Sequence, residues 1–282
     1  MPRSSSWRVQ HIETSAGQLF VRYREGVGIP LILWPSLFFD HSLYLGLTEW
    51  LDNPMILLDG PGHGRSHDTP DSLSLASCAQ AQEEILDKLG IQDVILAGTS
   101  WGGLVAILHA LQSPSRVRGL ILANTPFGMA VHIRLSTRLI VALTRLIPDH
   151  RLFRQGVARA FFSPQTSRRH PEVINNFLSQ QETFSNEGLY TAVRSVMIDR
   201  PSLVPDIPRL KVPVLVIAGE DDKLYPLSSL KEAAAAIPDH NIEVIPATGH
   251  VSLAERPHEA SSRIRKWLAA RFSGNYAESA RP

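Results

Sequence analysis

The chain lacks most of the features that would mark a special class of protein. It has 282 residues with a single cysteine, Cys78, so no internal disulfide can form, and we interpret this thiol as a small buried apolar group. The formal net charge is only +1, which gives no overall field that would attract nucleic acid. No apolar run approaches the roughly 18 residues of a membrane-spanning helix. We therefore expect neither a nucleic-acid partner nor a membrane partner.

The first residues also lack a secretory leader. The stretch 1–18 is polar and has no apolar segment of about 7 to 15 residues, so we expect a soluble, cytoplasmic protein. The composition is that of an ordinary globular protein, with 44% hydrophobic and 20% charged residues. At this length it favours one large domain, or a domain that carries an insertion.

Short apolar runs recur along the chain. Residues around Val9 and over 18–24 alternate like edge strands, and continuous apolar runs follow at 31–34, 55–58, 94–97, 120–123, 214–218 and 242–245. Continuous runs are typical of strands that are buried on both faces. Amphipathic patterns predict helices over 72–89, 101–112, 227–236 and 257–271. This alternation predicts an α/β fold, with a mostly parallel twisted sheet flanked by helices.

One long interval has no strand pattern. Residues 128–211 show helical patterns over 130–146, 152–162, 171–181 and 187–198, separated by proline or polar breaks. We interpret 128–211 as a helical cap inserted between the two parts of a core domain, residues 8–127 and 212–272. Residues 273–282 are small and polar, and we expect them to form a flexible tail.

The run at 94–97 leads into AGTSWGG, residues 97–103. A strand that turns sharply into a helix leaves little room for side chains, and glycine at Gly98 and Gly102 would remove the crowding around Ser100. Such a turn directs backbone N–H groups and the positive helix end toward the serine, where they would stabilise an oxyanion. The pattern G-x-S-x-G, with a strand before it and a helix after it, predicts that Ser100 is a nucleophile.

A serine nucleophile needs a base, usually a histidine that a carboxylate orients. Position selects among the eleven histidines, because functional groups of open α/β sheets gather at the carboxyl ends of strands, where His250 follows the last predicted strand. The run at 214–218 ends in Glu220, Asp221 and Asp222, and each is a candidate acid. The run at 120–123 ends in Asn124, which is not an acid.

Four separate motifs resemble those of the cap-bearing serine hydrolases of the α/β-hydrolase superfamily. LLDGPGHGRS (57–66) is similar to the family turn D-x-x-G-x-G-x-S, in which we interpret His63 as structural. AGTSWGG is similar to the nucleophile elbow, and GEDDKLYP (219–226) to G-x-x-D-x-x-x-P. GHVSLAERP (249–257) is similar to the histidine loop. The resemblance extends from about residue 8 to residue 270 and implies the α/β-hydrolase fold.

The resemblance also implies a mechanism of acyl transfer. It selects Asp222 over its two neighbours, giving a catalytic triad of Ser100, His250 and Asp222. It implies that the backbone N–H of Trp101, which follows the nucleophile, is one donor of the oxyanion hole, and that Leu37 supplies the other.

This chain departs from the family at the first oxyanion donor. Many members carry His-Gly after the corresponding strand, whereas LILWPSLFFD (31–40) has Pro35 and Ser36 there. Proline has no N–H and cannot donate. Leu37 is the donor that this alignment implies, and Ser36 is its rival. The stretch partly resembles the Asn-Ser-Leu-Gly segment of 3-oxoadipate enol-lactonases.

The resemblance implies a small-molecule substrate held between the cap and the sheet. Aromatic and apolar side chains that we expect to line this pocket are Phe38, Phe127, Met129, Phe161 and Phe162. We expect no cofactor, and no metal, because no histidine or carboxylate cluster has metal-ligand spacing. Carboxylesterase or lactonase activity is the leading interpretation. The alternatives are a carbon–carbon bond hydrolase of the meta-cleavage-product type and a non-hydrolytic ligand-binding member of the fold.

Overall fold

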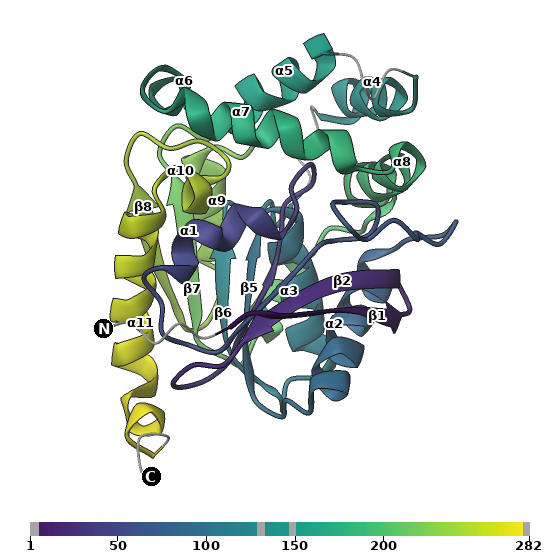
Figure 1. Cartoon of the computed structure of the whole chain (residues 1–282). Coiled ribbons are helices and arrows are strands. Elements are labelled where there is room, and N and C mark those ends of the chain that lie inside the picture. The colour runs from purple at the N-terminus through teal and green to yellow at the C-terminus, as the bar shows by residue number, and fades with distance from the viewer. Residues whose placement is uncertain (1–5, 129–132, 147–150, 279–282) are drawn as a thin grey trace.

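The computed structural model describes residues 6–128, 133–146 and 151–278. Figure 1 shows a twisted sheet with helices packed against it and a further group of helices above one end of its strands. The sheet has eight strands in the order β1-β2-β4-β3-β5-β6-β7-β8. All neighbouring strands from β4 to β8 in this order run parallel, and β2 joins them antiparallel. The predicted α/β-hydrolase fold is confirmed.

Every predicted run forms a strand. The strands are β1 (Arg8–Thr14), β2 (Gly17–Arg24), β3 (Leu31–Trp34), β4 (Met55–Leu58), β5 (Val94–Thr99), β6 (Val117–Ala123), β7 (Val214–Gly219) and β8 (His240–Ile245). All side chains of β3, β4, β5 and β7 are buried, which is why these strands are continuous apolar runs in the sequence. β8 lies at an edge and is partly exposed.

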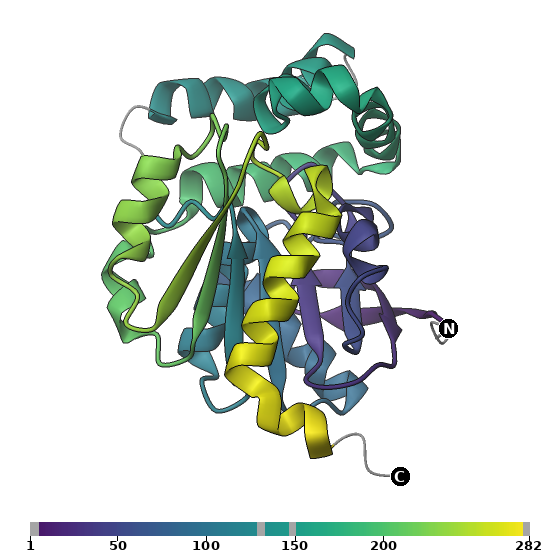
Figure 2. The ribbon, with the colours of Figure 1, turned by 90° about the vertical axis from the view of Figure 1, so that its left-hand side faces the viewer.

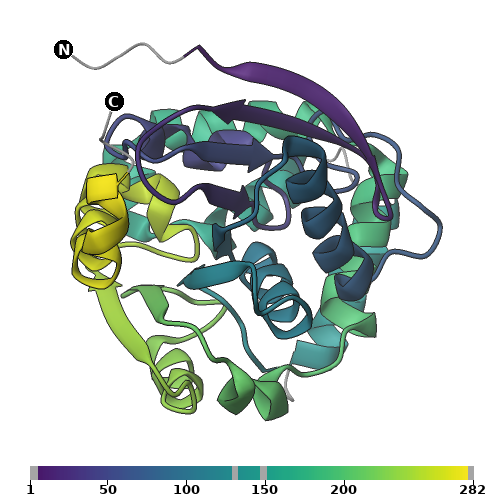
Figure 3. The same ribbon diagram turned by 90° about the horizontal axis from the view of Figure 1, so that it is seen from below.

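Helices cover both faces of the sheet. α2 (Leu75–Leu89) and α3 (Trp101–Gln112) pack against each other on one face, and α1 (Leu45–Thr48) and α11 (Pro257–Glu278) lie on the other (Figures 2 and 3). α2 begins with a capping box at Ser74 and ends at Gly90, whose φ of +70° lies in the left-handed region that favours glycine. α9 (Leu227–Ala234) follows β7, and α10 (Ser252–Glu255) follows β8.

α11 extends beyond its predicted end at residue 271. The backbone leaves the helical region at Phe272, and helix then continues to Glu278, within the segment expected to form a tail. Residues 279–282 of that segment lie outside the described residues. No helix within the described ranges is long and apolar enough to cross a bilayer.

Between β6 and β7 the described residues form helices and no strand. They are α4 (Ile133–Leu146), α5 (Arg151–Phe161), α6 (Pro164–Arg169), α7 (Pro171–Gln180), η2 (Gln181–Thr183), α8 (Asn186–Arg194), η3 (Ser195–Asp199) and η4 (Val204–Arg209). We call the described residues between 128 and 211 the helical insertion. α4 to α8 lie over the carboxyl ends of the parallel strands (Figure 1). α6 was not predicted, because Pro164 indicated a break, whereas it stands at the first turn of a helix that Ser163 caps.

Candidate active site

Ser100 occupies a tight turn between β5 and α3. Its backbone has φ +54° and ψ −108°, a conformation that non-glycine residues rarely adopt, and its N–H donates to the carbonyl of Ala123 at 2.8 Å. A Cβ atom at Gly98 would lie 2.1 Å from the carbonyl carbon of Gly102, and one at Gly102 would lie 1.9 Å from the carbonyl oxygen of Trp34. Only glycine fits at these two positions, as the crowding argument predicted.

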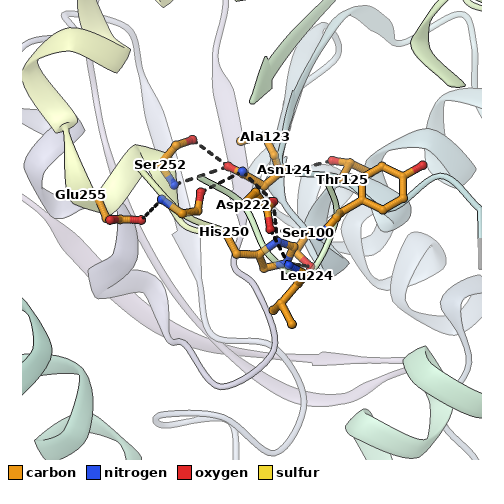
Figure 4. A network of polar contacts seen from close by, with 11 residues as sticks. Ser100, Ala123, Asn124, Thr125, Asp222, Leu224, His250, Ser252 and Glu255 are labelled. Atoms are coloured by element: carbon orange, nitrogen blue, oxygen red, sulfur yellow. Dashed lines mark hydrogen bonds and ion pairs between the residues drawn. The ribbon is translucent and has the colours of Figure 1, made fainter. Parts of the chain in front are cut away.

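The turn holds Ser100 against a histidine and a carboxylate. Ser100 Oγ lies 2.8 Å from Nε2 of His250, and Nδ1 of His250 lies 2.8 Å from Oδ2 of Asp222 (Figure 4). Oδ1 of Asp222 accepts from the backbone N–H groups of Leu224 at 2.9 Å and Tyr225 at 3.0 Å. All three side chains are buried. The structure therefore brings together the predicted nucleophile, the predicted base and the acid that the family resemblance selected.

The surroundings of Asp222 favour its ionised form. Burial acts to raise its pKa, but the charge and hydrogen bond of His250, a backbone N–H and the amide of Asn124 outweigh burial, so the pKa lies below its ordinary value. A carboxylate at this position would stabilise a positively charged imidazole. The other two candidate acids, Glu220 and Asp221, have exposed side chains.

Asn124 connects the two loops that carry the acid and the base. Its Nδ2 donates to Oδ2 of Asp222 at 3.0 Å and to the carbonyl of Gly249 at 3.1 Å, and its Oδ1 accepts from the hydroxyl of Ser252 at 2.7 Å (Figure 4). The residue is fully buried and has φ +48°. Asn124 was not predicted as a site residue, because it is not an acid. A polar side chain at the carboxyl end of a buried strand was the available signal.

Glu255 joins the histidine loop to the helical insertion. One carboxylate oxygen accepts from the N–H of Gly249 at 2.7 Å, and the other accepts from the N–H of Ser163 at 3.0 Å. The N–H of His250 donates to the carbonyl of Phe161 at 2.7 Å. Burial raises the pKa of Glu255, although these donors oppose the shift. The position of His250 is thus tied to the junction between α5 and α6.

Tyr44 connects the ends of two central strands. Its hydroxyl donates to the carbonyl of Trp34 at 2.6 Å and accepts from the N–H of Thr99 at 3.0 Å. Trp34 ends β3, and Thr99 is the residue before Ser100. Burial raises the pKa of Tyr44, so the group stays a neutral phenol that can both donate and accept.

The loop after β3 begins beside the nucleophile turn, because Trp34 pairs with Gly98. Among the described residues, the N–H groups of Leu37 and Trp101 donate to no protein acceptor, and the same holds for the N–H of Ser36. No protein acceptor in the described part of the chain therefore competes for these donors.

One of the predicted pocket residues, Phe161, stands next to the base, and a second, Phe38, packs against Phe161. The rings of Phe38 and Phe161 meet edge to face with centroids 5.9 Å apart, and the ring of Phe161 meets the imidazole of His250 at 5.2 Å. Both aromatic side chains are buried. Phe161 gives His250 an apolar neighbour, and Phe38 extends this aromatic surface away from the base.

The other predicted pocket residues have different surroundings. Phe162 packs against Phe39 and Phe177, with ring centroids 6.0 and 5.3 Å away. It therefore contacts the loop after β3 and α7. Phe127 is fully buried just past the end of β6. Met129 lies outside the described residues.

The sequence spacing did not reveal one group of acidic and histidine side chains that could hold a metal ion. Asp40, His41 and Asp59 place potential ligand atoms within 4.8 Å of one another. However, Oδ1 of Asp59 accepts from both the backbone N–H and the Nδ1 of His41, at 2.7 and 2.6 Å, and its Oδ2 accepts from the N–H of Arg65 at 2.9 Å. Asp40 caps η1 (His41–Tyr44) through the N–H of Ser42. These bonds already engage the group, and they tie His41 to the turn that contains Asp59.

Comparison with known proteins agrees with this architecture. The alpha/beta hydrolase family matches residues 31–263. The chain is 25% identical over 273 residues to the poly(3-hydroxyalkanoate) depolymerase of Ectopseudomonas oleovorans, and the matched region covers 95% of this chain and 94% of that protein. It is 25% identical over 233 residues to 3-oxoadipate enol-lactonase 2 of Acinetobacter baylyi, and the matched region covers 79% of this chain and 84% of that protein. A solved thermophilic esterase from Thermogutta terrifontis has a TM-score of 0.84 and 26% identity, covering 93% of this chain and 98% of that one. The chain therefore belongs to the alpha/beta hydrolase family, and it is a hydrolase.

Proposed function

We propose that the protein is a serine hydrolase that cleaves an ester or lactone bond of a small molecule through an acyl-enzyme. The observation that carries this proposal is the unbroken chain of hydrogen bonds from Ser100 through His250 to Asp222, with both links at 2.8 Å. A serine hydroxyl is a poor nucleophile until a base takes its proton, and this geometry supplies the base and orients it. An esterase and an enol-lactonase among the similar proteins support the choice of bond.

The first half of the reaction forms the acyl-enzyme. Ser100 Oγ attacks the carbonyl carbon while its proton passes to Nε2 of His250, and Asp222 stabilises the imidazolium. The N–H groups of Leu37 and Trp101 hold the oxyanion, each contributing about 3 kcal/mol to transition-state stabilisation. His250 then gives its proton to the leaving oxygen as the carbon–oxygen bond breaks.

The second half returns the enzyme to its starting state. His250 takes a proton from water, the resulting hydroxide attacks the acyl carbon, and the acid leaves as Ser100 Oγ regains the proton from His250. This sequence needs no cofactor or metal. The aromatic wall formed by Phe38 and Phe161 favours an acyl group of medium size that is partly apolar.

Initial-rate measurements on three bond types test the proposal. The substrates are p-nitrophenyl butyrate, an enol-lactone and a vinylogous diketone, each assayed with the wild type, Ser100→Ala and Asp222→Asn. We expect ester or lactone hydrolysis that falls about 1,000-fold or more in both variants. Turnover of the diketone alone would favour carbon–carbon bond hydrolysis. Tight binding without turnover of any substrate would favour a ligand-binding role.

A further inference from the structure

A glycine-rich turn, residues 59–66, anchors the loop after β3. We call residues 35–39 the oxyanion loop, because it carries the proposed donor Leu37. The N–H of Phe38 donates to Nε2 of His63 at 3.0 Å, and Nδ1 of His63 lies 2.8 Å from the carbonyl oxygen of Pro61. Both nitrogens of this fully buried imidazole are therefore used, one within the turn and one on the oxyanion loop.

These two contacts determine the protonation state of His63. A backbone N–H can only donate and a carbonyl can only accept, so Nε2 carries no proton and Nδ1 carries one. Burial lowers the pKa of His63 to about 4, which keeps the ring neutral at pH 7. A doubly protonated ring would set an N–H against the N–H of Phe38.

The oxyanion loop has few other bonds to hold it. Its described backbone hydrogen bonds are that of Phe39 to the carbonyl of Ser36, which lies inside the loop, and that of Phe38 to His63. Pro35 has no N–H to contribute. Phe38 also has φ +67°, in the left-handed region that non-glycine residues rarely adopt. The contact with His63 therefore holds an unfavourable backbone conformation one residue away from the N–H of Leu37.

His63 touches the other parts of the site as well. Its ring meets the ring of Trp101, the residue of the second proposed donor, at 5.4 Å. It also meets the ring of Phe184 in the helical insertion at 5.0 Å. One side chain thus contacts the residue after Leu37, the indole of Trp101 and a ring of the helical insertion.

We propose that His63, protonated on Nδ1 only, is a positioning residue that fixes the Phe38 peptide and thereby aims the N–H of Leu37 at the developing oxyanion. The inference rests on the proposed function, because it assigns a role within that reaction. An oxyanion exists only in the transition state and the tetrahedral intermediate. Loss of the anchor therefore lowers kcat and leaves KM almost unchanged.

Three variants separate the anchor from general packing. His63→Phe keeps a ring against Trp101 and Phe184 but removes the acceptor, whereas His63→Gln keeps an acceptor at the end of its side chain. His109→Phe is the control, because His109 is equally buried but lies in α3 and contacts Gln82 and Glu83. Hydrolysis of p-nitrophenyl butyrate is measured together with inhibition by a trifluoromethyl ketone, which forms an oxyanion on the serine.

We expect His63→Phe to lower kcat by about 10- to 100-fold with KM changed by less than about 3-fold. Inhibition by the trifluoromethyl ketone weakens by a similar factor. His63→Gln recovers most of the loss, and His109→Phe keeps kcat within about 3-fold. A His63→Phe enzyme with the kcat of the wild type, or a His63→Gln enzyme no better than His63→Phe, overturns the proposal.

A measurement on the wild type covers the case in which His63→Phe does not fold. Nitrogen-15 NMR of the histidine side chains reports which ring nitrogen carries the proton. We expect His63 to be protonated on Nδ1 alone at pH 7, with Nε2 coupled to the Phe38 amide. A proton on Nε2 overturns the anchor. Failure of a fluorophosphonate to label Ser100 in the wild type would instead remove the proposed function and leave the anchor to be decided by NMR.

Discussion

Single residues that never touch a substrate hold the catalytic groups in place. Asn124 donates to the same oxygen of Asp222 that His250 contacts, and it also binds the carbonyl of Gly249. Its amide therefore supports the ionised carboxylate and fixes the loop that presents His250. Substitution at this position acts on the triad without removing any member of it.

We expect Asn124→Ala to lower kcat by about 10-fold and the free energy of unfolding at pH 7 by about 1–3 kcal/mol, because buried acceptors lose their donor. The depressed pKa of Asp222 contributes stability above its unfolded pKa, and this contribution is lost as pH falls through the folded value. Removing the amide shrinks that contribution. The deficit of the variant, measured by urea unfolding, is thus larger at pH 7 than at pH 3. Equal deficits at both values would contradict this account.

Ser252→Ala is the matched control for Asn124. It removes the hydroxyl that donates to Oδ1 of Asn124 and leaves the contact between Nδ2 and Asp222 in place. We expect its kcat to stay within about 3-fold of the wild type.

Burial of the His63 imidazole should make the free energy of unfolding depend on pH. Its pKa is about 4 in the folded chain, against about 6.5 when unfolded. Between these values the unfolded state binds a proton that the folded state does not, so stability falls as pH falls, by about 1.4 kcal/mol per pH unit. The wild type should lose about 3 kcal/mol relative to His63→Gln between pH 7 and pH 4. A constant difference in unfolding free energy between the wild type and His63→Gln over this pH range would show that His63 is protonated in the fold.

At the scale of elements, Glu255 links the loop after β8 to the start of α6. Glu255→Ala leaves the N–H groups of Gly249 and Ser163 buried without their acceptor, and we expect a loss of about 2–5 kcal/mol of unfolding free energy. Glu255→Gln retains one amide oxygen and should recover part of this loss. Guanidinium unfolding of the two variants measures the difference. An alanine variant as stable as the wild type would mean that water or another group replaces the carboxylate.

The elements themselves were the most predictable part of the molecule. β3 and β4 have the predicted bounds, because a strand buried on both faces is a continuous apolar run with sharp ends. α6 was missed, since a proline that ends one helix and a proline that begins another look alike in a short polar stretch.

The sequence predicted a site residue only where a side chain of catalytic type follows the carboxyl end of a strand. Ser100 and His250 follow strands at one edge of the sheet, whereas the choice of Asp222 among three acids needed the family resemblance. The contact of Asn124 with Asp222 spans 98 positions in the sequence, and that of Glu255 with Ser163 spans 92. Such pairs carry no local pattern, because only the folded chain brings them together.

At the scale of the whole molecule, α4 to α8 lie over the carboxyl ends of the parallel strands (Figure 1). Ser100, Asp222 and His250 follow β5, β7 and β8 at these ends. Only 8% of Ser100 is exposed, Phe161 stands beside His250, and Phe38 packs against Phe161. We expect kcat/KM for p-nitrophenyl butyrate to exceed that for p-nitrophenyl palmitate by about 100-fold or more, since each methylene that does not fit costs affinity. Phe161→Ala keeps the backbone bond to His250 and should lower the ratio of kcat/KM for the butyrate to kcat/KM for the palmitate. A preference of the wild type for palmitate would contradict a small, enclosed site.

The proposed mechanism depends above all on Ser100 being a nucleophile that His250 activates. Treatment with a fluorophosphonate, followed by intact mass and peptide mapping, tests it most directly on the wild type, Ser100→Ala and His250→Ala. We expect one adduct on the peptide that contains Ser100, none in Ser100→Ala and strongly slowed labelling in His250→Ala. A folded wild type that takes up no label, or an adduct that persists in Ser100→Ala, would contradict it.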